Sequence, residues 1–151
     1  AENMLLASKR GEKRHLMPRR LKQRMAEFTK LAAQMNNGLE NRMTTPTGAL
    51  SGGQRQALSF LMATLKRPDI LLLDEHTAAL DPHTARNLLH ATNQRITEDH
   101  LTALMITHHM EDALKYGNRL IVLKDGQIKA DYNAAEKAQL TVDDLYAYFE
   151  M

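Results

Sequence analysis

The stretch Leu50–Pro82, "LSGGQRQALSFLMATLKRPDILLLDEHTAALDP", changes its hydrophobic pattern once, and this change decides the fold class. Its first half places apolar residues at helical spacing behind Ser51, a favoured N-cap, with Gln54 three residues on as in a capping box. Its second half contains Ile70–Asp74, a short continuous apolar run typical of a strand covered on both faces in a parallel sheet. A helix followed by such a strand favours an α/β fold.

Two further apolar runs, Thr102–Thr107 and Arg119–Lys124, predict two more strands of the same kind. Between the first two strands, Asp81 predicts the cap and Pro82 the first turn of a helix. A shorter helix, Met110–Tyr116, is predicted to link the second strand to the third. Counting one more strand that returns from a hairpin after the third, the predicted sheet has only three or four strands. This number is small for a sheet that must be covered on both faces.

The two ends of the chain predict further helices and one hairpin. Pro18 is predicted to open a helix, and Asn36–Gly38 to stop it with left-handed residues. Leu39–Ala49 is predicted to be a loop from its Pro, Gly and Thr content. The remaining predictions are a helix end at Asn3–Ala7, a hairpin turn at Asp125-Gly126 with a return strand Gln127–Tyr132, and a last helix capped by Thr141 with Asp144.

Composition bounds the class of protein. The 151 residues are enough for one ordinary domain, and the absence of cysteine excludes disulfides and thiolate metal sites. No apolar run reaches the length of a membrane span, and no signal-peptide pattern opens the chain. The net charge of +2 is uneven, because residues 1–24 hold eight Lys/Arg and two acids. No aromatic residue interleaves these charges, which favours a solvated connector over a nucleic-acid or lipid site.

Polar residues that could carry chemistry follow two of the predicted strands. Asp74 and Glu75 end the first strand, at the edge of a parallel sheet where ligands bind. One carboxylate can hold Mg²⁺ while the other faces a nucleophile. His108 ends the second strand at the same edge and could donate a hydrogen bond to a phosphate oxygen or orient a water. Asp81 has an equally good interpretation as a plain helix cap.

In this order the motifs resemble those of the ATP-binding cassette (ABC) ATPase family over roughly residues 40 to 130. Leu50–Gln54 resembles the signature motif of the family, and Ile70–Glu75 its Walker B strand with the catalytic glutamate. Ala79–Asp81 resembles the D-loop, and His108 the switch histidine. "LKDGQI", Leu123–Ile128, resembles the strand, turn and strand that usually follow, and the opening "ENMLLA" resembles the segment after the Q-loop.

The sequence departs from the commoner family pattern at two histidines. His76 stands where Pro or Ala is usual, and His109 where Asp is common, and neither replaces a motif residue. A histidine metal site is disfavoured because no helix pairs histidines at i, i+4. His108 and His109 are adjacent on an extended segment and are expected to point to opposite sides.

The chain has no phosphate-binding P-loop, Q-loop or base-stacking aromatic loop. Gly48 and Gly53 have P-loop spacing, but Gln54 occupies the lysine position and no strand precedes them. The resemblance therefore implies the C-terminal portion of a nucleotide-binding domain. Its fold would be part of the RecA-like P-loop NTPase sheet, residues 69–151, preceded by the α-helical subdomain, residues 1–68.

The resemblance also implies a role for each motif residue. In the family two such domains dimerise head to tail, and the signature of one covers the γ-phosphate of ATP held by the other. Glu75 would polarise the attacking water, Asp74 would help hold Mg²⁺, and His108 would contact the γ-phosphate. The residues that would contact the partner's ATP or couple the two sites are Ser51, Gly52, Gly53, Gln54 and Asp81.

The implied function is an ATP-hydrolysing subunit of a membrane ABC transporter, of the bacterial importer kind, here as a fragment. Its cofactors would be ATP and Mg²⁺, and its partners a second nucleotide-binding domain and transmembrane permease subunits, with no nucleic acid. It would lie in the cytoplasm at the inner face of the membrane. The alternatives are a soluble ABC ATPase that acts on DNA or ribosomes, and a non-catalytic binding module.

Overall fold

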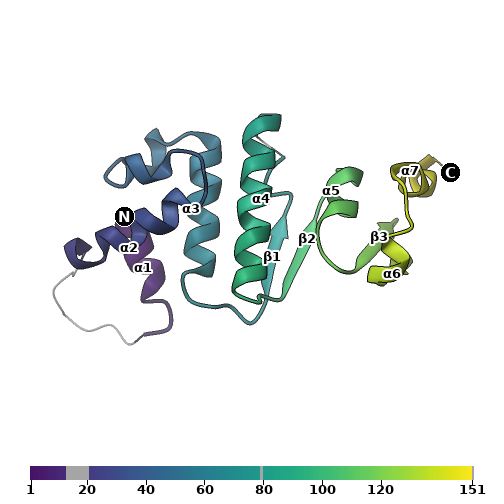
Figure 1. Cartoon of the computed structure of the whole chain (residues 1–151), viewed down its shortest axis with the longest axis horizontal. Helices are drawn as coiled ribbons and strands as arrows, with labels where there is room; N and C mark the ends of the chain where they lie inside the picture. Colours follow the sequence, from purple (N-terminus) through teal and green to yellow (C-terminus); the bar gives the residue numbers. More distant parts are fainter. Residues whose placement is uncertain (13–20, 79, 151) are drawn as a thin grey trace. The chain divides into compact units, whose positions relative to one another are not determined.

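The computed structural model describes residues 1–12, 21–78 and 80–150. The helix opening predicted at Pro18, most of the basic stretch and Ala79 of the D-loop resemblance lie outside the described residues. The chain packs as two compact units, Ala1–Met105 and Ile106–Met151 (Figure 1), which are described separately below. This division follows the packing within the chain. The boundary after Pro68 between the helical subdomain and the α/β part, which the family resemblance implies, stays a prediction.

The first unit begins with three helices, which are α1 (Glu2–Ser8), α2 (Leu21–Ala33) and α3 (Gly52–Thr64). The predicted stop after α2 is confirmed, because Asn36 and Gly38 have φ of 50° and 76°. The predicted loop before α3 contains two 3₁₀ helices, η1 (Leu39–Arg42) and η2 (Thr47–Ala49). Short 3₁₀ turns satisfy main-chain groups locally in a connector, so this segment is more ordered than its composition indicated.

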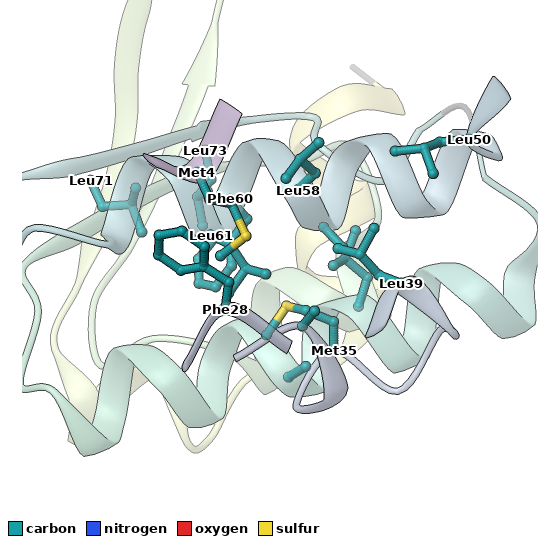
Figure 2. Close-up of a cluster of buried hydrophobic side chains, with 14 of the residues drawn as sticks. Met4, Phe28, Met35, Leu39, Leu50, Leu58, Phe60, Leu61, Leu71 and Leu73 are labelled. Carbon is teal, nitrogen blue, oxygen red and sulfur yellow. The ribbon is translucent and has the colours of Figure 1, made fainter. Parts of the chain in front are cut away.

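The core of the first unit lies among α1, α2 and α3 and reaches the first strand. Figure 2 shows its largest members, with Phe28, Met4 and Met35 at most 1% exposed. Each of α2 and α3 contributes an apolar face to this core, with Phe28 and Ala32 of α2 and Ala57 and Leu61 of α3 buried. Phe60 of α3 is buried as well. The other labelled members are Leu39, Leu50, Leu58, Leu61, Leu71 and Leu73.

The strands β1 (Leu71–Asp74) and β2 (Ala103–Ile106) form a two-stranded parallel sheet, and α4 (Pro82–Glu98) connects them. The prediction that both faces of these strands are covered is wrong for the described chain. Leu71 and Leu73 pack into the core, whereas Leu72 and Leu104 are 66% and 50% exposed. The reason is that the core helices cover the face of Leu71 and Leu73, and successive side chains of a strand point to opposite faces.

The second unit contains α5 (Met110–Lys115) and a hairpin of β3 (Leu120–Lys124) and β4 (Gln127–Tyr132). The predicted turn is confirmed, since Asp125 and Gly126 have φ of 54° and 71°, as a type I′ turn requires. The hairpin pairs Leu120 with Tyr132 and Leu123 with Ile128, with an irregularity after Val122.

The expectation that the third strand joins the sheet of the first two is wrong for the described residues. Here β3 pairs with β4 in a sheet of its own, so the described strands form two sheets of two. Antiparallel strands joined by a two-residue turn pair locally, whereas parallel pairing needs a crossover to a distant strand. Local pairing by itself therefore accounts for the hairpin.

Two helices complete the second unit, α6 (Ala134–Lys137) and α7 (Val142–Glu150). The predicted cap of α7 is confirmed, because the Asp144 carboxylate accepts from the Thr141 main-chain N–H at 2.8 Å and from its hydroxyl at 2.7 Å. These hydrogen bonds hold the pKa of Asp144 below its ordinary value. No helix was predicted at α6, although Asn133 and Glu136 form a capping box that could have revealed it.

Lys137 of α6 is buried and links that helix to the end of α5. Its ammonium donates to the main-chain oxygens of Tyr116 and Gly117, and burial lowers the pKa of Lys137. Gly117 has a φ of 74°, a left-handed conformation that commonly follows the end of a helix. None of the described helices combines the length and the apolar character that crossing a bilayer requires.

Candidate functional site

The start of α3 has the geometry that its sequence predicted. The Ser51 hydroxyl oxygen accepts from the Gln54 main-chain N–H at 3.2 Å, and the Gln54 side-chain oxygen accepts from the Ser51 N–H at 3.2 Å. The Arg55 N–H donates to the Ser51 main-chain oxygen at 2.9 Å. Within the described chain, the N–H groups of Gly52 and Gly53 donate to no protein acceptor. These two amides, at the positive end of the helix dipole, are the ones available to an anion.

The two glycines differ in what surrounds them. A Cβ on Gly52 would lie 3.4 Å from Leu80 Cδ2, an ordinary contact distance. A Cβ on Gly53 would lie 2.4 Å from Thr84 Cγ2, which is a clash. Both glycines are predicted from the sequence to allow close approach of a ligand. Gly53 is needed, in addition, for the start of α3 to pack against the first turn of α4, a contact that no local pattern could show.

Replacement of Gly53 by alanine should therefore destabilise the chain. Alanine is favoured over glycine in a helix by about 0.5–1 kcal/mol, but overpacking costs about 1–3 kcal/mol, so the clash should win. Gly52→Ala, which meets no clash, should be neutral or stabilising. Denaturant unfolding of both variants measures this difference.

The partner residue provides a second check on Gly53→Ala. Thr84→Ser removes the clashing methyl group and keeps the hydroxyl, so it should recover most of the stability that Gly53→Ala loses. Equal stability of the Gly52 and Gly53 variants, or no coupling between Gly53→Ala and Thr84→Ser, would contradict this account of the packing.

Asp81 is the cap of α4, as predicted. Its carboxylate accepts from the main-chain N–H groups of His83 at 3.1 Å and Thr84 at 3.0 Å. Hydrogen bonds from Thr84, and to a smaller extent from His83, hold the pKa of the exposed Asp81 carboxyl below its ordinary value. Since Thr84 also contacts the start of α3, the N-termini of α3 and α4 lie next to each other. A coupling role of Asp81 between two nucleotide sites stays a prediction.

Asp74 and Glu75 lie at the carboxyl end of β1, and both are exposed. Glu75 has a φ of 41°, a left-handed conformation that is uncommon outside glycine and typical of functional sites. The chain turns immediately afterwards, with the Ala78 N–H donating to the Glu75 main-chain oxygen at 3.0 Å. Mg²⁺ binds through one or two carboxylates together with phosphate and water, and an exposed carboxylate at Asp74 fits that requirement.

His108 belongs to the second unit, and the other candidate residues belong to the first. The expectation that His108 and His109 point to opposite sides is wrong, because their ring centroids are 4.3 Å apart with the planes at 36°. The segment bends there into α5, since His109 is the N-cap residue and its N–H donates to the Thr107 hydroxyl at 3.1 Å. Among the described residues, no three His, Cys, Asp or Glu side chains converge as a metal site would require.

Comparison with known proteins defines the class to which this site belongs. The ABC transporter family matches residues 2–78, which are 77 of the 151 residues. The chain belongs to this family of ATP-binding domains.

Three curated relatives carry names of transport proteins. The chain is 39% identical to the tyrosine transport ATP-binding protein of Clostridioides difficile (strain R20291), over 99% of the chain and 59% of that protein. It is 41% identical to the thiamine import ATP-binding protein of Salmonella choleraesuis (strain SC-B67), over 65% of the chain and 41% of that protein. It is 35% identical to a phosphonates import ATP-binding protein of Lactobacillus johnsonii, over 72% of the chain and 42% of that protein. The chain thus spans 41–59% of the length of these relatives.

Solved structures show the same fold. A dimeric bacterial ABC transporter cassette superimposes with a TM-score of 0.67 and 29% identity, over 88% of the chain and 55% of the cassette. A post-hydrolysis state of the same cassette, bound to ADP and inorganic phosphate, gives the same values. The predicted fold class, part of a P-loop NTPase domain with a parallel sheet, is confirmed.

Proposed function

We propose that this chain is the part of an ABC importer ATPase that carries the signature helix, the Walker B strand and the switch histidine. One observation supports this most strongly. The start of α3 leaves the two amides of Gly52 and Gly53 open and lies against the capped start of α4. A surface made of two helix N-termini is suited to the phosphates of a nucleotide.

The reaction would be ATP hydrolysis, with ATP and Mg²⁺ as cofactors. Mg²⁺ neutralises the charge that develops on the phosphates, and Asp74 would help hold it. Glu75 would accept the proton of the attacking water, and His108 would donate a hydrogen bond to the γ-phosphate. Ser51, with the amides and Gln54 behind it, would contact the ATP of a second nucleotide-binding domain in a head-to-tail dimer. The dimeric state of the solved cassette supports such a partner.

The transport role rests on the three relatives, which are ATP-binding proteins for tyrosine transport and for thiamine and phosphonate import. The complete subunit would lie at the cytoplasmic face of the membrane and bind permease subunits. To test this, the complete subunit is expressed with the permease genes next to its own gene. Permease in membranes should bind the subunit and stimulate its ATPase activity. Stimulation by DNA or ribosomes instead would contradict the transport role.

The 151-residue chain by itself should not hydrolyse ATP and should bind ATP weakly or not at all. Phosphates need a nest of main-chain N–H groups together with a lysine, and no segment of the 151 residues supplies both. Calorimetry with Mg·ATP measures this directly. Micromolar affinity in a stable monomer would show that the chain needs no P-loop.

The isolated chain should also self-associate, because apolar side chains are exposed on both sheets. Leu72 and Leu123 are 66% and 57% exposed. Light scattering should show that Leu72→Ser reduces self-association. Leu6→Ser, at an equally exposed position on α1, is the matched control and should not. Equal effects of the two substitutions would contradict a role of the sheet face.

A further inference from the structure

Asn37 connects the turn after α2 to the start of α3. It lies between Asn36 and Gly38, the two residues with positive φ that end the helix. Its side-chain amide donates to the Gly53 main-chain oxygen at 3.1 Å, and its main-chain oxygen accepts from the Gln54 side-chain amide at 3.2 Å. The two segments are therefore joined by hydrogen bonds in both directions.

The Gln54 side chain is held at both of its ends. Its oxygen accepts from the Ser51 N–H, and its amide nitrogen donates to Asn37. This arrangement occupies the Ser51 amide and leaves only the amides of Gly52 and Gly53 open at the start of α3. The hydrogen bonds of Asn37 and Gln54 thus select which main-chain groups can reach an anion.

We propose that Asn37 is a positioning residue for the capture of the partner domain's phosphate by the start of α3. Glycine has wide main-chain freedom, so the peptide groups at Gly52 and Gly53 need an external restraint to keep one orientation. The hydrogen bond from Asn37 to the Gly53 oxygen fixes the peptide group between Gly53 and Gln54 and so limits rotation at Gly53, while the bond from Gln54 to Asn37 keeps Gln54 folded back. The inference rests on the proposed function of this helix start.

A purely structural role would concern only the turn itself. The Asn37 side-chain oxygen accepts from the Leu39 N–H at 3.2 Å, which is a local turn contact. Aspartate at this position keeps that acceptor and loses the donor to Gly53. Asn37→Asp therefore separates the two roles. Asn41→Asp is the matched control, because it adds the same charge on η1, where the Asn41 side-chain amide donates to the neighbouring Glu40 carboxylate at 3.1 Å.

The test uses the complete subunit in a hydrolysis-deficient background, with ATP-dependent dimerisation measured by sedimentation. Asn37→Asp should weaken dimerisation by roughly two- to tenfold, the cost of having to order one more group at the interface when the partner binds. ATP binding to the monomer and thermal stability should stay close to those of the parent. Asn41→Asp should dimerise like the parent.

Three outcomes would overturn the proposal and can be told apart. If the parent dimerises with ATP and Asn37→Asp does so equally well, Asn37 has no positioning role while the function of the helix start stands. If Asn37→Asp loses dimerisation only in proportion to a loss of thermal stability, its role is structural. If the parent itself forms no ATP-dependent dimer, the proposed function fails, and this inference fails with it.

Discussion

Glu75→Gln in the complete subunit is expected to abolish ATP turnover and to leave ATP binding intact. Glutamine keeps the size and hydrogen-bonding capacity of glutamate but cannot accept the proton of the attacking water. General-base help is worth about 10²–10⁴-fold, so the rate of phosphate release should fall at least that far. Glu75 already has a φ of 41°, and the substitution adds no branch at Cβ, so the main chain should not change.

The measurement is steady-state phosphate release together with ATP binding to the same protein. Glu98→Gln, at the exposed end of α4, is the matched control and should turn over ATP normally. Turnover of the Glu75 variant near the wild-type rate would show that this carboxylate is not the base.

Ser51→Arg in the complete subunit is expected to block ATP-dependent dimerisation and to leave ATP binding by the monomer unchanged. Ser51 is exposed at the start of α3, beside the open amides, and a long side chain there would occupy the space that a partner's phosphate needs. The cap would also be lost, at a cost of about 0.5–2 kcal/mol in stability. Ser51→Thr, which keeps a capping hydroxyl, is the control that should dimerise.

Ser51→Asp gives an independent version of the same experiment. Aspartate is a good cap, so the helix should keep its stability, while the negative charge should repel phosphate. Gly53→Asp is less informative, because its Cβ would clash with Thr84 before any partner arrives. Sedimentation with ATP in a hydrolysis-deficient background measures whether each Ser51 variant still dimerises. Normal dimerisation of both Ser51→Arg and Ser51→Asp would contradict a role of this helix start toward a partner's nucleotide.

Features that depend on neighbours within about four residues could be predicted from the sequence. Ser51 and Gln54 form a capping box, Asp81 caps α4, and Asp125 with Gly126 turns the hairpin, all as predicted. The motifs of the ABC family could be located for the same reason, because each is a short pattern of neighbouring residues. Three local features were not predicted correctly: the 3₁₀ helices η1 and η2, the orientation of His108 and His109, and α6, whose capping box begins at Asn133.

By itself, the sequence determined the order of helices and strands, the caps and turns between them, and the family of the protein. These follow from main-chain hydrogen bonding and side-chain spacing along a continuous segment. Only the tertiary structure decided that Leu72 is exposed and that β3 pairs with β4 rather than with the first sheet. It also placed Thr84 against Gly53 and Asn37 against Gln54, because such contacts depend on how distant segments pack.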